Sequence, residues 1–410
     1  MKKALLLVNS LHPSRNHNSN LLLRVVKHMD LDVTISSLVV AHNADGSFKN
    51  VTNSNPPHSI DGFPASFTKV NAADRLISRL LARISNNDRA CTLVSLIKLY
   101  WANIFRARHA DIVLSTYQGI VPSFAASQLA HRRKQPIKAL YLMDPTDSMY
   151  DDALSVADEH KWFLKMLKNT DIVFTTPFIK KAMVLKGHAQ LVDHIVEVSF
   201  PMITDFPYTS HQHDPNKITL LYCGSLYLQS KIRSPEYFFK IISRLDERFR
   251  VVIVGWESQK ALAQFPIQTS AEVIALPQMK YDDLMQIMAD SDVLINLGNS
   301  VPVHLPSKTL EFINTGKPIV NFYKLDSCPT LHYTRRYPLC LNLNEKDTDI
   351  DNAAEEFISF CIGKKGKSLD RAWIKQNYAD STPEEIAKRI CEECSKLNNN
   401  VNVKPNSDLQ

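Results

Sequence analysis

The stretch "HLPSKTLEFINTGKPIV", residues 304–320, predicts a short helix followed at once by a buried strand. Ser307 stands where a side chain can cap the start of a helix. Gly316 suits the left-handed conformation that closes a helix, and Pro318 prevents the helix from continuing. The apolar run after Pro318 has the composition of a strand covered on both faces. A short helix that leads into such a strand is typical of an α/β protein.

The same alternation extends through the second half of the chain. Apolar, β-branched runs predict strands, and the amphipathic stretches between them predict helices. The expected strands are "ITLLYCGS", "FRVVIVGW", "EVIALP", "DVLINLGN" and "PIVNFY", and the expected helices include "SPEYFFKIISRL" and "YDDLMQIMADS". Strands that alternate with helices predict a parallel sheet with helices on both faces.

The first half repeats this pattern, with expected strands "ALLLVNS", "LDVTISSLVV", "ADIVLSTY", "IKALYLMD" and "TDIVFTTP". The fold class is therefore predicted as α/β, with two Rossmann-like, doubly wound parallel-sheet domains that face each other across a cleft. A polar segment at 43–66 interrupts the first half and is expected to be a surface loop or mobile flap.

A segment rich in proline, histidine and polar residues, "MITDFPYTSHQHDPNK", separates the two halves. Beyond the second half, the sequence predicts helices that pack back on the first domain, and then a polar, disordered tail. The expected boundaries are an N-terminal domain at 1–205, a linker at 206–217, a C-terminal domain at 218–365, C-terminal helices at 366–396 and the tail at 397–410.

The composition is that of a soluble globular protein, with 410 residues of which 44% are hydrophobic and 22% charged. Seven scattered cysteines indicate buried thiols in a reducing compartment. The first apolar run is too short for a signal peptide, and no stretch approaches the roughly 20 apolar residues of a membrane span. A net charge of +6 suits an anionic ligand but is too diffuse for nucleic acid. A cytoplasmic protein is expected.

The start of the helix in 304–320 has the chemistry to bind an anion beside a diol. Free backbone N–H groups and the helix dipole attract phosphate, and Lys308 adds a full charge. Glu311, one turn further along the same face, can accept two hydrogen bonds from a vicinal diol. A nucleoside diphosphate offers both groups. The alternative is an ordinary exposed ion pair between Lys308 and Glu311.

A second anion site is predicted in the stretch "LLYCGSLYLQSKIRSPEYFF" at 220–239. Ser234 and Pro235 predict the start of a helix, so the residues before them form the loop between strand and helix. α/β proteins bind anions in such loops. The candidate ligands there are Gly224, Ser225, Lys231 and Arg233. A solvated basic loop without a ligand is the alternative.

These motifs occur together in the order and spacing of a known family. The segments "CGSLY", "IRSPEYF", "VIVG", "DVLINLGN", "LPSKTLEFINTGKPIV" and "RRYPLCLNL" resemble bacterial GT-B glycosyltransferases of retaining family 4, of the kind found in surface-polysaccharide clusters. The resemblance covers most of residues 218–342, and the first half matches only as architecture. It implies that the first domain binds the acceptor and the second domain binds a nucleotide sugar.

The resemblance also implies roles for the short helix. Glu311 would hold the donor ribose, and Lys308, with Ser307 and the helix N-terminus, would face the donor diphosphate or sugar. Two positions depart from the family pattern. Val303 stands where a second glutamate is usual, and Met143 stands where many members carry a histidine.

In the loop after the first strand of the second domain, the resemblance implies that Gly224 and Ser225 bring backbone N–H groups to the phosphates. Arg233 or Lys231 would neutralise their charge. Asn299, in "NLGN", is a further candidate for donor binding, and its alternative role is to fix the loop.

Transfer of a sugar requires the anomeric C–O bond to break, and fixed cations on the departing diphosphate are the main means of lowering that barrier. No Asp-x-Asp pair is placed as a manganese ligand, and the histidines form no HxxxH or similar cluster, so no metal or other cofactor is expected. If configuration is retained, the leaving phosphate can itself take the acceptor proton. Asp144, at the end of "KALYLMD", could then orient the acceptor hydroxyl, so the candidate catalytic residues are Asp144, Lys308 and Glu311. A capping role in the turn "DPTD" is the alternative for Asp144.

One aromatic residue follows a predicted core strand. Trp256, after "VIVG", could stack on a nucleobase. Packing against the core is its alternative.

Residues 73–108 combine helical apolar spacing with basic residues, among them Arg75, Arg79, Arg83, Lys98, Arg106 and Arg108. This pattern fits a pair of helices lying on an anionic membrane, and ordinary core helices with basic edges explain it equally well. A peripheral membrane contact would bring the enzyme to an acceptor carried on lipid.

The sequence and its resemblance to this family predict a metal-independent hexosyltransferase for cell-surface polysaccharide synthesis, and the resemblance alone implies that configuration is retained. It would move a sugar from a nucleotide-diphosphate donor to a saccharide or polyprenyl-diphosphate-linked acceptor. A nucleotide-sugar 2-epimerase and a non-catalytic nucleotide-sugar-binding subunit on the same fold remain alternatives.

Overall fold

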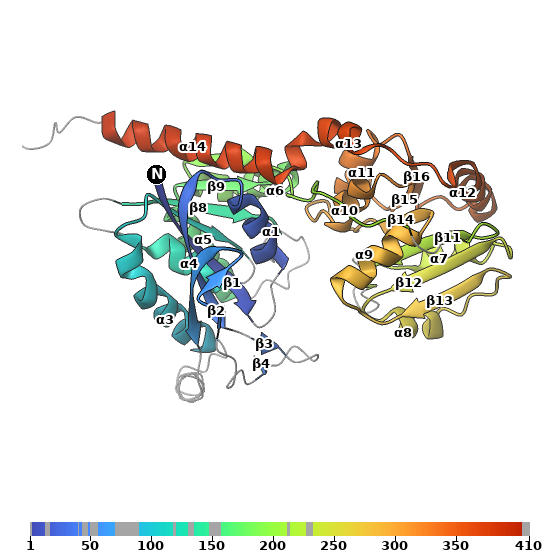
Figure 1. Ribbon diagram of the computed structural model, residues 1–410, viewed down its shortest axis with the longest axis horizontal. Helices are drawn as coiled ribbons and strands as arrows, with labels where there is room; N and C mark the ends of the chain where they lie inside the picture. The colour runs from blue at the N-terminus through green and yellow to red at the C-terminus, as the bar shows by residue number, and fades with distance from the viewer. Residues whose placement is uncertain are drawn as a thin grey trace, which may run out of the picture. The chain divides into compact units, whose positions relative to one another are not determined.

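The computed structural model describes residues 2–12, 17–39, 41–42, 48–49, 56–69, 90–117, 120–129, 135–146, 157–210, 214–226 and 233–403. The chain divides into two compact units (Figure 1). The first unit consists of Met1–Pro201 and Pro383–Gln410, and the second of Met202–Thr382.

The first unit contains an eight-stranded sheet with the order β10-β9-β8-β7-β1-β2-β6-β5. All neighbouring strands are parallel except β5 and β6, which are antiparallel. β1 is buried continuously from Ala4 to Val8, which is typical of a strand with helices on both faces. The strands are β1 (Lys2–His12), β2 (Leu31–Val39), β5 (Ser59–Ile60), β6 (Phe63–Lys69), β7 (Ile112–Thr116), β8 (Ile137–Leu142), β9 (Ile172–Thr175) and β10 (His194–Glu197), with a separate antiparallel pair β3 (Ala41–His42) and β4 (Phe48–Lys49).

The helices of this unit connect the strands, and the last helix of the chain joins them. That helix lies beside α1 and contacts β8 (Figure 1). Lys2 Nζ at the start of β1 donates a hydrogen bond to Ser395 Oγ on it at 2.9 Å. The described helices are α1 (His17–Val26), α3 (Ala90–Ala107), α4 (Ile120–Gln128), α5 (Ala157–Lys168), α6 (Pro177–Leu185), the 3₁₀ helix η2 (His188–Leu191) and α14 (Pro383–Val403).

The second unit contains a six-stranded, fully parallel sheet with the order β13-β12-β11-β14-β15-β16. When these six strands are numbered 1 to 6 along the chain, they lie side by side in the order 3-2-1-4-5-6, which is the strand order of dinucleotide-binding folds. The order reverses between β11 and β14, where such sheets bind ligands. The strands are β11 (Ile218–Cys223), β12 (Phe249–Val254), β13 (Glu272–Leu276), β14 (Val293–Leu297), β15 (Ile319–Tyr323) and β16 (Cys340–Asn344).

Aromatic side chains make much of the core of the second unit. Phe322 on β15 packs against Phe238 and Phe357, with ring centroids 5.6 and 6.2 Å apart. These three rings are buried. Phe238 and Phe357 come from two different helices, which the shared contact fixes on the sheet. The helices are α7 (Glu236–Ile242), α8 (Ser258–Gln264), α9 (Tyr281–Asp290), α10 (Lys308–Thr315), α11 (Pro329–Thr334), α12 (Ile350–Lys364), α13 (Arg371–Asn377) and the 3₁₀ helix η3 (Ala379–Ser381).

The predicted fold class, two α/β domains with parallel sheets, is confirmed. The expected loop at 43–66 is wrong at its end, because Phe63 starts β6, which pairs in parallel with β2. The disordered tail expected from 397 is also wrong at its start, because α14 continues to Val403. The C-terminal helices expected at 366–396 are divided, since residues up to Thr382 belong to the second unit.

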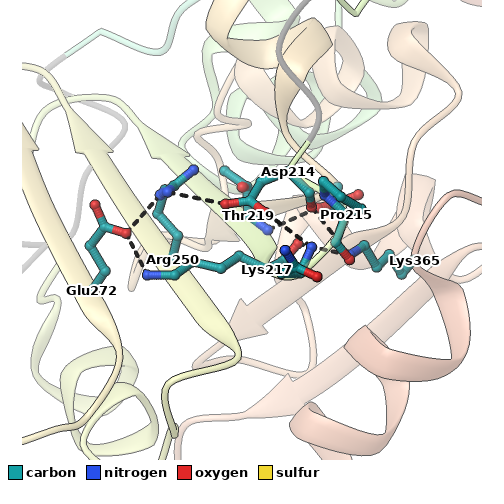
Figure 2. A network of polar contacts seen from close by, with 9 residues as sticks. Asp214, Pro215, Lys217, Thr219, Arg250, Glu272 and Lys365 are labelled. Atoms are coloured by element: carbon teal, nitrogen blue, oxygen red, sulfur yellow. Dashed lines mark hydrogen bonds and ion pairs between the residues drawn. The ribbon is translucent and has the colours of Figure 1, made fainter.

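A polar network lies at the amino edge of the second sheet, where β11, β12 and β13 begin (Figure 2). Arg250 Nε donates to Glu272 Oε2 at 2.9 Å, and Arg250 Nη2 donates to Asp214 Oδ2 at 3.3 Å. Lys217 Nζ contacts the same Glu272 oxygen at 2.7 Å, and Lys365 Nζ donates to the main-chain oxygen of Lys217 at 2.8 Å. The network fixes how the chain enters β11. Its ion pairs are partly exposed, so each contributes little to stability.

Candidate functional site

The candidate site lies in the second unit, at the carboxyl edge of its sheet. Gly224 follows β11 and Asn299 lies two residues after the end of β14, the two strands between which the strand order reverses. α10 begins nine residues after Asn299. The strand order therefore brings two of the predicted donor-binding stretches to one edge of one sheet.

Two glycines allow the loops after β11 and β12 to approach each other closely. Gly255 has a φ of 137°, and a Cβ built on it would lie 2.4 Å from the main-chain oxygen of Gly224. No side chain fits there. The Gly224 N–H donates to the main-chain oxygen of Val254 at 3.0 Å. The prediction that this N–H faces a phosphate is therefore wrong for this conformation, because the group is already used between the strands. Ser225 is the residue of the pair whose amide remains a candidate.

A side-chain bridge ties the loop after β11 to the loop after β14. Arg233 Nε and Nη2 donate to Asn299 Oδ1 at 3.1 and 2.9 Å. Asn299 Nδ2 donates in turn to the main-chain oxygen of His304 at 3.1 Å, and Asn299 is fully buried. The structure thus brings Arg233 and Asn299 together, with Asn299 in its alternative role of fixing the loop. Arg233 is held at the point where the strand order reverses. Lys231 lies outside the described residues.

The predicted short helix is present as α10, with one error at its start. Ser307 has helical backbone angles, φ −57° and ψ −28°, and its side chain makes no capping hydrogen bond. The capping prediction is wrong because a residue that has already entered the helix cannot present its hydroxyl to the first turn. The closing glycine is confirmed. Gly316 has a φ of 79°, and a Cβ there would lie 2.5 Å from the main-chain oxygen of Leu369.

Glu311 is held by two donors. Lys308 Nζ forms a close ion pair with Glu311 Oε2, and Tyr281 Oη donates to Glu311 Oε1 at 2.9 Å. Only 7% of the Glu311 side chain and 27% of the Lys308 side chain are exposed. The alternative of an ordinary exposed ion pair is therefore wrong. A mostly buried, charged pair on the first turns of a helix is a costly arrangement, which is more common at functional sites than elsewhere.

Interactions with neighbouring groups keep Lys308 charged. Burial by itself would lower the pKa of Lys308, but its interactions with neighbouring acidic groups, among them the Glu311 carboxylate, outweigh burial and raise it. Burial raises the pKa of the Cys223 thiol to about 12, and the Lys308 ammonium opposes that shift only in part. At neutral pH the site therefore presents the Lys308 cation and, at the end of β11, the neutral Cys223 thiol.

Two half-exposed aromatic side chains follow neighbouring strands at the same edge. Trp256 lies two residues after β12 and is 49% exposed, and Tyr281 begins α9 after β13 and is 50% exposed. Simple core packing does not account for Trp256, because half of it is in contact with solvent. Flat apolar surfaces of this kind suit the faces of a nucleobase or sugar.

Asp144 belongs to the first unit. It follows β8, and its Oδ2 accepts a hydrogen bond from Asn18 Nδ2 at 2.8 Å. The same Asn18 nitrogen donates to the main-chain oxygen of Tyr117 at 3.2 Å, just after β7. Asp144 is thus oriented at the carboxyl edge of the first sheet by a residue of α1, and partly buried.

No protein-family model matches the chain, and no curated protein sequence gives a significant match. Solved structures do match over nearly the whole chain. An E. coli trehalose-6-phosphate protein bound with UDP-2-fluoro glucose has a TM-score of 0.62 at 12% identity and covers 96% of this chain and 99% of its own. The lipopolysaccharide outer core galactosyltransferase WaaB has a TM-score of 0.56 at 11% identity, with 92% and 95% covered. WaaG, a glycosyltransferase involved in lipopolysaccharide biosynthesis, has a TM-score of 0.55 at 12% identity, with 94% and 99% covered.

The chain has the GT-B fold. Two solved structures with this fold are glycosyltransferases by name, and a third holds a UDP-sugar analogue. At such low identity the match concerns the fold alone.

Two residues of this candidate site are not among those predicted from the sequence. The sequence predicts Tyr281 only as part of a helix start and Cys223 only as a buried thiol. Their positions in the sequence could have indicated them. Cys223 is the last residue of β11 and Tyr281 begins the helix after β13, and the topology places both strand ends at the carboxyl edge of the sheet. In the described part of the chain, no group of three or more His, Cys, Asp or Glu residues could hold a metal ion. None of the described helices has the length and apolar composition of a membrane span.

Proposed function

We propose that this chain is a metal-independent, retaining glycosyltransferase that moves a sugar from a nucleoside-diphosphate donor to a saccharide or lipid-linked acceptor. The observation that carries the proposal is the buried Glu311 carboxylate, paired with Lys308 at the start of α10 beside the loops joined by Arg233 and Asn299. Groups that bind anions and a carboxylate that can accept hydrogen bonds from a diol occur together at the carboxyl edge of the sheet, where parallel sheets bind nucleotides.

Each part of the donor has a matching group. The diphosphate would lie against the start of α10, Lys308 and Arg233, which supply two fixed cations and the positive end of the helix dipole. Glu311 would accept the ribose hydroxyls. Trp256 and Tyr281, half exposed at the ends of β12 and β13, are suited to the nucleoside end.

These groups also suit the chemistry. The anomeric C–O bond breaks, the electron pair leaves with the diphosphate, and positive charge grows on the sugar. Lys308 and Arg233 are held in place before the reaction, so they stabilise the developing negative charge without reorganisation. A phosphate oxygen of the leaving group would take the acceptor proton on the same face, which retains configuration. Asp144 would orient the acceptor hydroxyl.

A lipid-linked acceptor in surface-polysaccharide synthesis is supported by an exposed apolar row on α3. Ile97, Trp101 and Phe105 are 46%, 62% and 62% exposed and are spaced four residues apart, so they lie on one face of the helix. Leu96 and Leu99 are buried on its other face. Core packing accounts for the buried face and leaves the exposed one unexplained.

The charges of α3 indicate which kind of surface the exposed row could contact. The segment 90–108 contains Lys98, Arg106 and Arg108 and no acidic residue. The Arg108 guanidinium lies 4.6 Å from the centre of the Phe105 ring. An apolar row with tryptophan and basic neighbours is typical of helices that lie in the headgroup region of anionic bilayers. We therefore propose peripheral contact with the inner face of the plasma membrane. The part of the predicted membrane segment at 73–89 lies outside the described residues.

The test is incubation of the purified chain with UDP-, GDP- and ADP-sugars, with and without EDTA. A transferase should release the nucleoside diphosphate slowly by hydrolysis in the absence of acceptor, and EDTA should not stop it. Glu311→Gln should abolish release, whereas Glu236→Gln, an exposed glutamate on α7, should not. Formation of an epimer without hydrolysis would instead identify the 2-epimerase, and binding without turnover would identify the non-catalytic subunit.

A further inference from the structure

Tyr281 is the second donor to the carboxylate proposed to hold the ribose. Its hydroxyl donates to Glu311 Oε1 at 2.9 Å, across 30 residues of sequence. Lys308 pairs with the other oxygen, Oε2, from within the same helix. Each oxygen of this carboxylate therefore has one donor from the chain itself.

Two donors on two oxygens determine the orientation of the carboxylate. The terminal torsion of a glutamate side chain is broad, so a single lysine on a flexible stem leaves the plane of the carboxylate free to turn. The phenol of Tyr281 is attached to a rigid ring and adds the second fixed point. A carboxylate accepts about four hydrogen bonds, so two accepting positions stay open for a diol.

Tyr281 is also well placed to meet the nucleoside directly. It is the first residue of α9, and half of it is exposed although its hydroxyl is bonded to a buried carboxylate. An exposed ring next to Glu311 can cover the ribose while its hydroxyl holds Glu311. The two roles separate experimentally, because phenylalanine keeps the ring and removes the hydroxyl.

We propose that Tyr281 is a positioning residue that, through Glu311, makes the site selective for nucleoside diphosphates with an intact ribose diol. The inference rests on the proposed function and adds a determinant of donor specificity to it. Tyr281 acts on the orientation of Glu311. Its hydroxyl should therefore affect the affinity only of ligands whose sugar hydroxyls donate hydrogen bonds to Glu311.

The experiment measures binding of UDP, GDP and ADP, and of their 2′,3′-dideoxy forms, by calorimetry to the full chain. For the diphosphate that binds most tightly, Tyr281→Phe should lower affinity by about tenfold, and for its dideoxy form by less than about twofold. Tyr208→Phe is the matched control. Tyr208 Oη donates to Asp282 Oδ1 at 2.7 Å, which is the same kind of bond to the first turn of the same helix, so its loss should leave both affinities unchanged.

A third variant tests the route through Glu311. In a Glu311→Gln background, the further change Tyr281→Phe should cost less than about twofold, because the group that Tyr281 positions is already lost. The inference is overturned if Tyr281→Phe leaves diphosphate affinity unchanged, raises it, or lowers the native and dideoxy ligands equally. If the wild-type chain binds none of the three diphosphates, the proposed function fails as well. Thermal unfolding of each variant checks that folding is intact.

Discussion

Arg233 donates two hydrogen bonds to the same oxygen of Asn299, with its Nε 3.1 Å and its Nη2 2.9 Å from Asn299 Oδ1. Because Asn299 is neutral, this contact fixes the guanidinium without neutralising its charge. The bridge spans the two strands between which the sheet order reverses. A cation held in this way is suited to a diphosphate.

Removing the Arg233 cation should slow turnover. Arg233→Ala is expected to lower kcat for donor hydrolysis by roughly a hundredfold, because one fixed group on a developing charge contributes on that scale. Arg250→Ala is the matched control, since Arg250 lies in the polar network at the opposite edge of the same sheet (Figure 2). Equal losses in the two variants would show that the effect is one of stability or net charge.

Lys308 and Glu311 should be coupled in stability as well as in activity. Lys308→Met leaves the Glu311 carboxylate mostly buried without its cation and is expected to lower the free energy of unfolding by about 2 kcal/mol. The double variant Lys308→Met with Glu311→Gln should recover most of that loss in denaturant unfolding and remain inactive. A double variant that is as unstable as the single one would contradict this account of the pair.

Glu345 should make stability depend on pH. Burial raises its pKa from 4.5 to about 7, and Lys324, 3.4 Å away, acts in the opposite direction. Because the folded state favours the protonated acid, this stabilising contribution is complete below about pH 4.5 and is lost as the pH rises through about 7. The free energy of unfolding should therefore fall from pH 5 to pH 8, by up to roughly 3 kcal/mol from this group.

Glu345→Gln tests the assignment, because glutamine does not titrate. The pH dependence between 5 and 8 should flatten in this variant, measured as denaturant midpoints across the range. The same change at the exposed Glu236 should leave the slope as in the wild type. A Glu345→Gln slope that matches the wild type would assign the dependence to other groups.

The exposed row of α3 predicts membrane binding. The chain should sediment with phosphatidylcholine vesicles that contain phosphatidylglycerol, and binding should weaken with salt. Trp101→Ala with Phe105→Ala should reduce it by roughly tenfold or more. Trp256→Ala removes a half-exposed aromatic from the second unit and should leave vesicle binding unchanged. The proposal would be contradicted if the double variant bound vesicles as well as the wild type does and if binding did not depend on the anionic lipid.

Alternation of apolar and amphipathic segments was enough to predict most strands, because parallel strands covered on both faces are continuously apolar. β6 was missed for the opposite reason. "FPASFTK" is not a continuous apolar run and contains Pro64, and its strand conformation comes from pairing with β2. The spacing of Lys308 and Glu311 on one face of a short helix predicted that their side chains lie together, and the structure pairs them. Tyr281 could not be predicted in the same way, because its bond to Glu311 depends on how α9 and α10 pack.

The most direct test of the central claim is a crystal structure of the chain with a bound nucleoside diphosphate, taken from UDP, GDP or ADP by affinity. The account predicts ribose hydroxyls within about 3 Å of the Glu311 carboxylate, with the phosphates at the start of α10 and near Arg233. Density for the nucleotide at the opposite, amino edge of the sheet, against Lys217 and Arg250, would contradict it.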